Sequence, residues 1–207
     1  IEDPWFLAHH APLFAGSENI ARYLCLYEIY KMTLGTAGHI AEIGSWMGTS
    51  LLYFAKLTQM FEPNSYTTIH GFEWFEGMKP NEKISRISAG TYSADYDELK
   101  SLISAQGLQD IAHIHKMDVS KELAGFVDEH PSLRFKIVFV DCSIYEVAAE
   151  AVRHLWPRLE VGGILLLDDY NHSSVPEETI AINELLPDET VKTFPWSRQP
   201  SGYIVKT

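Results

Sequence analysis

The sequence is poor in cysteine, in positive charge and in long apolar runs. It has only two cysteines, Cys25 and Cys142, so no disulfide framework supports the fold and a reducing, cytoplasmic location is expected. Lysine and arginine number 16 against 28 aspartates and glutamates, which gives a net charge of −12. This charge repels nucleic-acid phosphates and anionic membrane surfaces, so neither is an expected partner. Apolar runs such as residues 162–167 are much shorter than the roughly 20 residues of a membrane-spanning helix.

Residues suitable for a core are plentiful, since 46% of the 207 residues are hydrophobic and 12% are aromatic. That is enough for one globular domain. Short β-branched and aliphatic runs alternate with segments of helical periodicity, which is typical of βαβ units. The sequence therefore predicts an α/β fold with a doubly wound, mainly parallel, seven-stranded sheet that ends in an antiparallel hairpin. Because the chain begins at Ile1 rather than at methionine, we expect it to be a trimmed form.

The expected elements follow from these patterns. The expected strands are short aliphatic or β-branched runs at residues 38–43, 66–72, 111–116, 135–140, 164–168, 190–194 and 202–206. The expected helices carry apolar residues at three/four spacing or clear end signals, at residues 17–34, 49–60, 95–106, 120–130, 145–156 and 177–186. In the first of them, Ser17 is the expected N-cap, and the expected apolar stripe is Ile20, Leu24, Tyr27 and Lys31. A long loop is expected at 73–94. We expect 1–36 to be an N-terminal arm and helix, with a lid as one interpretation, and 37–207 to be a cofactor-binding catalytic domain.

The first strand-to-helix turn, residues 42–50, reads Glu-Ile-Gly-Ser-Trp-Met-Gly-Thr-Ser. Ligands of open α/β sheets bind at the carboxyl ends of strands, where glycine lets the backbone approach them. The Gly-x-x-x-Gly spacing is not a pyrophosphate fingerprint and no Walker lysine follows, so a nicotinamide-dependent oxidoreductase is a weaker alternative. Glu42 can pair with a ligand ammonium, and the amides after Gly48 can meet a carboxylate. S-adenosylmethionine carries both groups. The candidate binding residues are Glu42, Gly44, Ser45, Gly48, Thr49 and Ser50. The alternative is a tight turn with packing glycines.

Two further strand ends supply candidate cofactor contacts. Glu73 ends the second strand, where an acid can accept both hydroxyls of a ribose. Trp74 or Phe75 beside it can lie against an adenine ring, although an aromatic residue here is as often core packing. Asp118, followed by Val119, comes just after the third strand and can accept from an adenine amino group. Its alternative role is to cap the next helix, in competition with Ser120.

Three carboxylates follow two consecutive predicted strands. Asp141 ends one strand, and Asp168 and Asp169 end the next. If these strands are neighbours, the three side chains converge, and carboxylates that close repel one another unless a cation lies between them. Oxygen ligands of this kind suit Mg²⁺, Mn²⁺ or Ca²⁺. The alternative is that they cap a helix and tie down a loop.

Four segments together resemble the macrocin O-methyltransferase (TylF-like) family. They are the turn at 42–50, Gly-Phe-Glu-Trp-Phe-Glu-Gly at 71–77, Asp-Cys-Ser-Ile-Tyr-Glu at 141–146, and the Asp-Asp-Tyr that ends at Tyr170. The resemblance extends over about residues 38–186 and implies a class I, Rossmann-like methyltransferase that uses S-adenosylmethionine. It also implies O-methylation of a sugar or another natural-product small molecule, with Mg²⁺ held by Asp141, Asp168 and Asp169. A homo-oligomer is compatible with the sequence.

One position departs from the family pattern. The family shows Asp-x-Asp at this point, and the second aspartate is its suspected base, whereas this chain has Ser143. Serine is not a base near neutral pH without help. Asp141 remains a catalytic candidate through the metal. His172 is the candidate base or an additional metal ligand, with a solvated loop histidine as the alternative. The missing aspartate also leaves open a catalytically impaired binding or assembly protein of the same fold.

The other histidines that stand out in the sequence are not assigned a role in the site. His113 and His115 alternate along a predicted strand and are interpreted as ordinary strand residues. His9 and His10 belong either to a lid over the substrate or to a plain N-terminal arm.

Overall fold

The computed structural model describes residues 6, 9–78 and 88–207, and in them six strands form one sheet. The strands are β1 (His39–Ile43), β2 (Ile69–Glu73), β3 (Ala112–Lys116), β4 (Phe135–Val140), β5 (Leu159–Leu167) and β6 (Gly202–Val205). They lie in the order β3-β2-β1-β4-β5-β6. β1 to β5 are parallel to their neighbours, and β6 is antiparallel to β5. The predicted doubly wound, mainly parallel α/β fold is confirmed.

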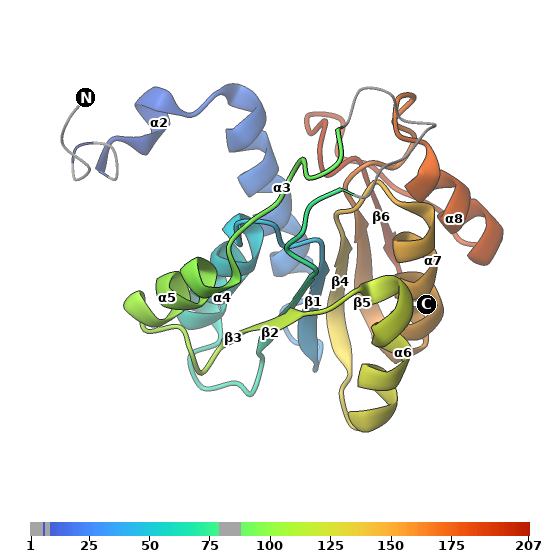
Figure 1. Cartoon of the computed structure of the whole chain (residues 1–207), viewed down its shortest axis with the longest axis horizontal. Coiled ribbons are helices and arrows are strands. Elements are labelled where there is room, and N and C mark those ends of the chain that lie inside the picture. The colour runs from blue at the N-terminus through green and yellow to red at the C-terminus, as the bar shows by residue number, and fades with distance from the viewer. Residues whose placement is uncertain (1–5, 7–8, 79–87) are drawn as a thin grey trace.

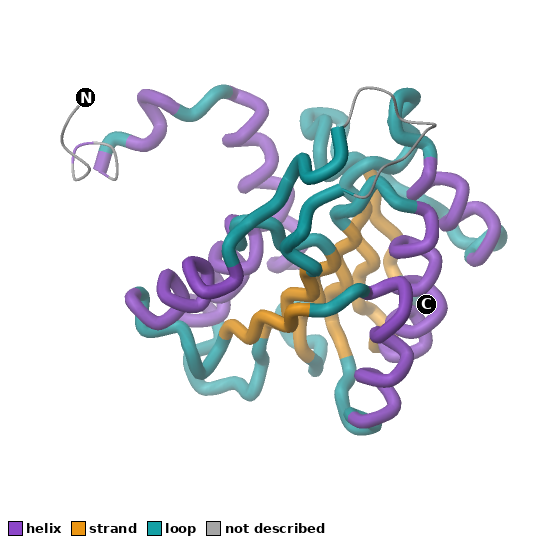
Figure 2. Tube along the Cα trace, in the orientation of Figure 1, coloured by secondary structure: helices purple, strands orange, loops and turns teal. Residues whose placement is uncertain are grey.

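Helices cover both faces of this sheet. They are α2 (Ala11–Phe14), α3 (Ser17–Met32), α4 (Thr49–Phe61), α5 (Tyr96–Ala105), α6 (Val119–Glu129), α7 (Tyr145–Leu155), the 3-10 helix η1 (Trp156–Arg158) and α8 (Glu177–Leu185). α3, α4 and α5 pack on one face and α6, α7 and α8 on the other, with the strands between them (Figures 1 and 2). Successive strand residues contribute side chains to the cores on opposite faces of the sheet, because their side chains point in opposite directions. Ile40 belongs to one core and Ala41 to the other. No helix of the described ranges is long and apolar enough to cross a bilayer.

Helix α3 packs into the core, whereas α2 buries no residue and lies apart from the sheet (Figure 1). The predicted apolar stripe of α3 is wrong: Ile20 and Leu24 are exposed, and the buried residues are Cys25, Leu26, Ile29 and Tyr30. The predicted N-cap is also one residue off, since Gly16 holds that position without a side-chain bond. The face of α3 that is buried is the one that packs against the sheet, and the local periodicity of the sequence does not specify which face that is.

The predicted C-terminal hairpin is present in part: its second strand is β6, but its first does not form a regular strand. In residues 190–194, ladder pairing is reduced to one bridge between Lys192 and Tyr203. Pro195 has no N–H for a ladder, and Ser197 N turns back to donate to Phe194 O. β6 therefore completes the sheet by pairing with β5, and the described sheet has six strands rather than seven.

Strand β5 begins at Leu159 rather than at residue 164. Gly162 and Gly163 lie inside the strand, where the register with β4 shifts. Gly162 has a φ of +81° and donates its N–H to Lys206 O at 2.8 Å. A glycine pair usually indicates a turn, but here it forms an irregularity within a strand.

Candidate active site

The carboxyl ends of the parallel strands open into a cavity of about 1130 Å³. The strand order reverses between β1 and β4, the place where open α/β sheets bind ligands. The predicted site residues that line the cavity are Gly44, Ser45, Thr49, Ser50, Glu73, Trp74, Asp118, Val119, Asp141, Asp168, Asp169 and His172. Glu42 and Gly48 lie outside this lining.

Glu42, at the end of β1, is completely buried. Ser45 Oγ donates to its Oε2 at 2.7 Å, while Oε1 has no hydrogen-bond partner among the described residues. Burial raises the pKa of Glu42 to about 7, and hydrogen bonds from Ser50 and Ser45 offset this only in part. The unsatisfied Oε1 is a buried acceptor that fits a donor group of a ligand, such as an ammonium.

The two glycines of the first turn are explained by close packing. A Cβ on Gly44 would lie 2.1 Å from the carbonyl oxygen of Asp141, and one on Gly48 would lie 2.4 Å from Leu99 Cδ1. Both glycines have positive φ, +90° and +79°. The alternative interpretation as packing glycines therefore accounts for both positions, although Gly44 also lines the cavity.

Glu73 ends β2 as predicted, but backbone amides already hold its carboxylate. Its Oε1 accepts from Trp74 N at 2.8 Å and Phe75 N at 3.0 Å, and its Oε2 accepts from Trp46 N at 2.8 Å. Three of the roughly four acceptor positions of a carboxylate are thus occupied. Glu73 retains about one position for a ligand hydroxyl, fewer than the two that the sequence suggests.

Trp46 and Tyr92, two of the aromatic residues that line the cavity, were not assigned to the site from the sequence. Trp46 has a φ of +46°, which is rare for a residue with a Cβ, and the bond from its N–H to Glu73 holds this conformation. Its indole meets the ring of Tyr92 edge-on, with ring centroids 5.4 Å apart. Both side chains are about half exposed and line the cavity. Trp46 lies within the turn at residues 42–50, and this position in the sequence could have identified it as a site residue.

Asp118 occupies the N-cap position of α6, as its alternative role required, but its side chain makes no capping bond to the backbone. It accepts from Ser120 Oγ at 2.6 Å and Lys121 Nζ at 2.8 Å. The Asp118 N–H donates to Glu122 Oε2 at 2.6 Å, so a side chain of the first helical turn satisfies the backbone of the N-cap residue. Val119, the first residue of α6, is buried beside it.

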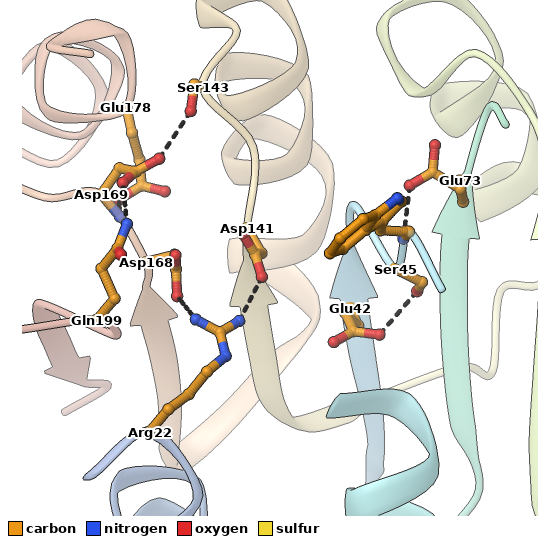
Figure 3. A network of polar contacts seen from close by, with 11 residues as sticks. Arg22, Glu42, Ser45, Glu73, Asp141, Ser143, Asp168, Asp169, Glu178 and Gln199 are labelled. Atoms are coloured by element: carbon orange, nitrogen blue, oxygen red, sulfur yellow. Dashed lines mark hydrogen bonds and ion pairs between the residues drawn. The ribbon is translucent and has the colours of Figure 1, made fainter. Parts of the chain in front are cut away.

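Arg22 of α3 lies between two of the three predicted metal ligands (Figure 3). Its guanidinium donates to Asp141 Oδ2 and to Asp168 Oδ1, each at 2.5 Å. It also stacks on Phe139, 5.5 Å from the ring centroid. Burial lowers the pKa of Arg22, but Asp168 and Asp141 outweigh this and raise it above its usual range. Burial raises the pKa of both carboxyl groups, and Arg22 opposes the rise.

Asp169 turns toward other partners (Figure 3). Its Oδ2 accepts from Ser143 Oγ and its Oδ1 from Gln199 Nε2, both at 2.7 Å. The backbone N–H of Asp169 donates to Glu178 Oε1 at 3.0 Å. Glu178 is completely buried, and burial together with the nearby aspartates raises its pKa well above the usual range.

Arg22 and Glu178 were not predicted, yet both left a signal in the sequence. Arg22 precedes the buried residues Cys25 and Leu26 at three/four spacing, and Glu178 precedes Ala181 and Ile182 in the same way. A charged residue within the buried stripe of a helix requires a buried partner.

The three aspartates lie in one region as predicted, but they do not form a metal site as they stand. In the described ranges, no group of three His, Cys, Asp or Glu side chains is arranged to hold a metal ion. The reason is that Arg22 bonds Asp141 and Asp168, while Asp169 faces Ser143 and Gln199. The described side chains therefore do not fit a divalent cation in this arrangement.

His172 lies at the cavity, in the turn after β5, and its backbone N–H donates to Asp169 O at 3.1 Å. Its Nδ1 accepts from Ser174 N at 3.3 Å. His9 and His10, by contrast, lie on the exposed N-terminal arm outside the cavity lining. The cavity meets the N-terminal region through Asn19, Arg22 and Tyr23 of α3.

His113 and His115 lie in strand β3 as predicted, but they also belong to a histidine cluster that the sequence did not indicate. Thr68 Oγ1 lies 2.7 Å from His39 Nδ1 and 2.9 Å from His70 Nε2, and His70 Nδ1 lies 3.1 Å from His115 Nε2. The rings of His70 and His115 are stacked, and His113 lies tilted against His70. Neighbouring strands bring together histidines that are far apart in the sequence.

Comparisons with known proteins agree with this geometry. A family model described as a methyltransferase domain matches residues 41–170. The sequence matches no curated protein. The solved structure of the calicheamicin methyltransferase CalS11 has a TM-score of 0.86 at 22% identity, over 99% of this chain and 87% of that one. A second CalS11 structure, described as a TDP-rhamnose 3′-O-methyltransferase, gives 0.80 at 22%, over 99% and 88%. The O-methyltransferase NovP gives 0.73 at 16%, over 91% and 80%.

The structural matches are less than 25% identical in sequence, so they establish the fold. The family model spans more than half of the chain and includes the first turn, both central strands and the Asp-Asp-Tyr segment. The chain therefore belongs to the methyltransferase-domain family, and it is an S-adenosylmethionine-dependent methyltransferase, as its motifs predict.

Proposed function

We propose that this chain methylates a hydroxyl of a small molecule, with a sugar or another hydroxyl-rich natural product as the substrate class. One observation carries the proposal: a single cavity of about 1130 Å³ joins the first turn to the cluster around Arg22. A pocket for one drug-sized ligand measures roughly 300–1,000 Å³, so this cavity has room for a cofactor and an acceptor together. The shared fold with a TDP-rhamnose 3′-O-methyltransferase supports this substrate class.

The cofactor end is the side of β1 and β2. S-adenosylmethionine, when bound, supplies an electrophilic methyl group on a positively charged sulfur. Glu42 lies outside the cavity lining but has a buried acceptor oxygen without a partner in the described chain, and Glu73 at the cavity has an acceptor position for a hydroxyl. The first amides of α4, from Thr49 on, lie where the helix dipole favours an anionic group. These features fit the ammonium, ribose and carboxylate of the cofactor.

The acceptor end is the side of β4 and β5. Arg22, Ser143 and Gln199 line it as donors, and Asp141, Asp168 and Asp169 line it as acceptors. Groups of both kinds bind hydroxyls, which donate and accept at once. The main task of these residues is to align the attacking oxygen with the methyl group.

The proton of the acceptor hydroxyl requires a base, and His172 stays our candidate. Because Ser174 N donates to Nδ1, the neutral ring carries its proton on Nε2. His172 must therefore release this 3.3 Å bond before it can accept a proton from the acceptor. The predicted Mg²⁺ is not part of the proposal, because Arg22 occupies the carboxylates that were to hold it.

Calorimetry and a methyl-transfer assay test the proposal together. We expect S-adenosylmethionine or its demethylated product to bind and NAD not to bind, with methyl transfer to a hydroxylated acceptor. Glu73→Ala should weaken cofactor binding by about tenfold to a hundredfold, because a charged hydrogen-bond acceptor is lost. The matched control is Glu76→Ala, since Glu76 is 62% exposed and pairs only loosely with Lys116 at 3.6 Å.

The outcomes separate the alternatives. Cofactor binding without transfer to any hydroxylated acceptor would favour a binding or assembly protein, which the replacement of the usual aspartate by Ser143 makes worth testing. Binding of NAD alone would favour an oxidoreductase. The cytoplasmic location and a homo-oligomer remain predictions.

A further inference from the structure

We infer that Arg22 is the resident cation of the acceptor site, in the place that the sequence motifs assign to Mg²⁺. Its consequence for methyl transfer rests on the proposed function. That Arg22 occupies the site does not depend on the proposed function, and this occupancy can be measured separately.

The site requires a cation. Asp141, Asp168, Asp169 and Glu178 lie around one end of β4 and β5, and the last three are at most 6% exposed. Carboxylates removed from water repel one another and either take up protons or pair with a positive group. Among the described residues, Arg22 is the positive group that bonds two of them.

Arg22 is held in place by the core. It lies on α3 one turn before Cys25 and Leu26, which are 1% and 0% exposed. Its guanidinium lies over Phe139 of β4, and its own side chain is only 25% exposed. Removing Arg22 from the carboxylates would require α3 to leave the sheet or the side chain to give up two short charged hydrogen bonds.

The carboxylate oxygens are already engaged. Asp141 Oδ2 and Asp168 Oδ1 accept from Arg22, and both oxygens of Asp169 accept from Ser143 and Gln199. Mg²⁺ demands oxygen ligands in near-octahedral geometry at about 2.0–2.1 Å and loses its water reluctantly. A cation of this kind would have to displace four hydrogen bonds.

A guanidinium can perform part of the work expected of the metal. It has five N–H donors, of which two bond Asp141 and Asp168, and Arg22 lines the cavity, so we expect one of the other donors to meet an acceptor oxygen there. It stays charged at any working pH, and it favours a hydroxyl that is losing its proton. Arg22 thereby orients the acceptor without chelation.

Manganese binding tests the occupancy directly, by electron paramagnetic resonance of the full chain after metal removal. The wild type is expected to have no stoichiometric Mn²⁺ site. Arg22→Met should free the carboxylates and tighten Mn²⁺ binding by about tenfold or more, and adding Asp168→Asn should abolish the gain. Arg153→Met is the matched control, since Arg153 pairs with Glu150 on the surface of α7. Circular dichroism confirms that each variant is folded.

A tight Mn²⁺ site in the wild type that Asp168→Asn removes would overturn the inference. A folded Arg22→Met variant that binds Mn²⁺ no more tightly than the wild type would also overturn it. In the transfer assay, the wild-type rate in EDTA should stay within about twofold of the rate in Mg²⁺, because no metal activates the hydroxyl. Loss of transfer in EDTA would also overturn it. Absence of transfer under every condition would refute the proposed function and leave the manganese result to decide the inference.

Discussion

At the residue scale, the site depends on carboxyl groups that are buried away from solvent. Glu42 is the clearest case, because it is completely buried, no other carboxylate bonds it, and one of its oxygens has no partner in the described chain. A buried acid of this kind prefers its protonated form, so folding and protonation are coupled.

Glu42 should therefore reduce stability as the pH rises. In the folded chain its pKa is about 7, against an ordinary value of 4.5. Between these values the folded state holds a proton that the unfolded state has lost, so the free energy of unfolding falls as the pH increases. Glu42→Gln should remove this loss, which amounts to about 3 kcal/mol between pH 4.5 and pH 8. Urea unfolding of both proteins at pH 5 and pH 8 checks it.

The informative quantity is the difference between the two proteins, because other groups titrate in the same range. Glu76→Gln serves as the control for a glutamate in water, since its carboxylate is 62% exposed. Parallel pH dependences for wild type and Glu42→Gln would contradict the prediction.

At the scale of elements, strands β1, β2 and β3 bring histidines together on one side of the sheet. His70 of β2 contacts His115 of β3 diagonally across the strand pair, and His39 is joined to His70 through Thr68. Burial lowers the pKa of His70 to about 3 and of His115 to about 4, and the neighbouring histidines add to the effect. This cluster therefore stabilises the sheet only while its rings are neutral.

The histidine cluster should make the sheet sensitive to acid. As the pH falls below 6.5, the unfolded state takes up protons that the folded rings do not bind. Stability is therefore lost from pH 6.5 down to about pH 4 for His115 and about pH 3 for His70. His70→Gln keeps a polar side chain and should recover on the order of 2 kcal/mol at pH 4.5 relative to pH 7. Thermal or urea unfolding at the two pH values measures this difference.

His9→Gln is the matched control, because His9 is exposed on the N-terminal arm. An acid dependence that is the same in wild type and His70→Gln would show that the cluster does not limit stability at low pH.

At the scale of the whole molecule, the cofactor end and the acceptor end belong to different halves of the sheet. β1 and β2 carry Glu42 and Glu73, while β4 and β5 carry Asp141 and Asp168. A ligand that bridges strands on both sides of the switch point stabilises the folded chain over the unfolded one.

Cofactor binding should therefore raise the melting temperature. At a concentration 100 times Kd, S-adenosylhomocysteine should add about 2.7 kcal/mol. For a chain of this size, that corresponds to a rise of roughly 5–10 °C. Differential scanning fluorimetry with S-adenosylhomocysteine and NAD in parallel measures it. A rise with NAD and none with S-adenosylhomocysteine would refute the cofactor assignment.

The sequence by itself determined the features that depend on short stretches of chain. Alternation of apolar runs with helical periodicity specified the α/β class and the order of the elements, because these patterns report burial within a few residues. Acids at the ends of strands or directly after them specified where Glu42, Glu73, Asp141 and Asp168 lie, because the ends of parallel strands meet at one edge.

Only the tertiary structure decided what those acids contact. Arg22 is 119 residues from Asp141 and 146 from Asp168, and their bonds exist because α3 packs its Cys25 side on the sheet rather than the predicted Ile20 side. The same holds for the histidines of neighbouring strands, which pair through sheet register. Local patterns carry no information about which helix face meets which strand, since that choice is made by packing the whole core.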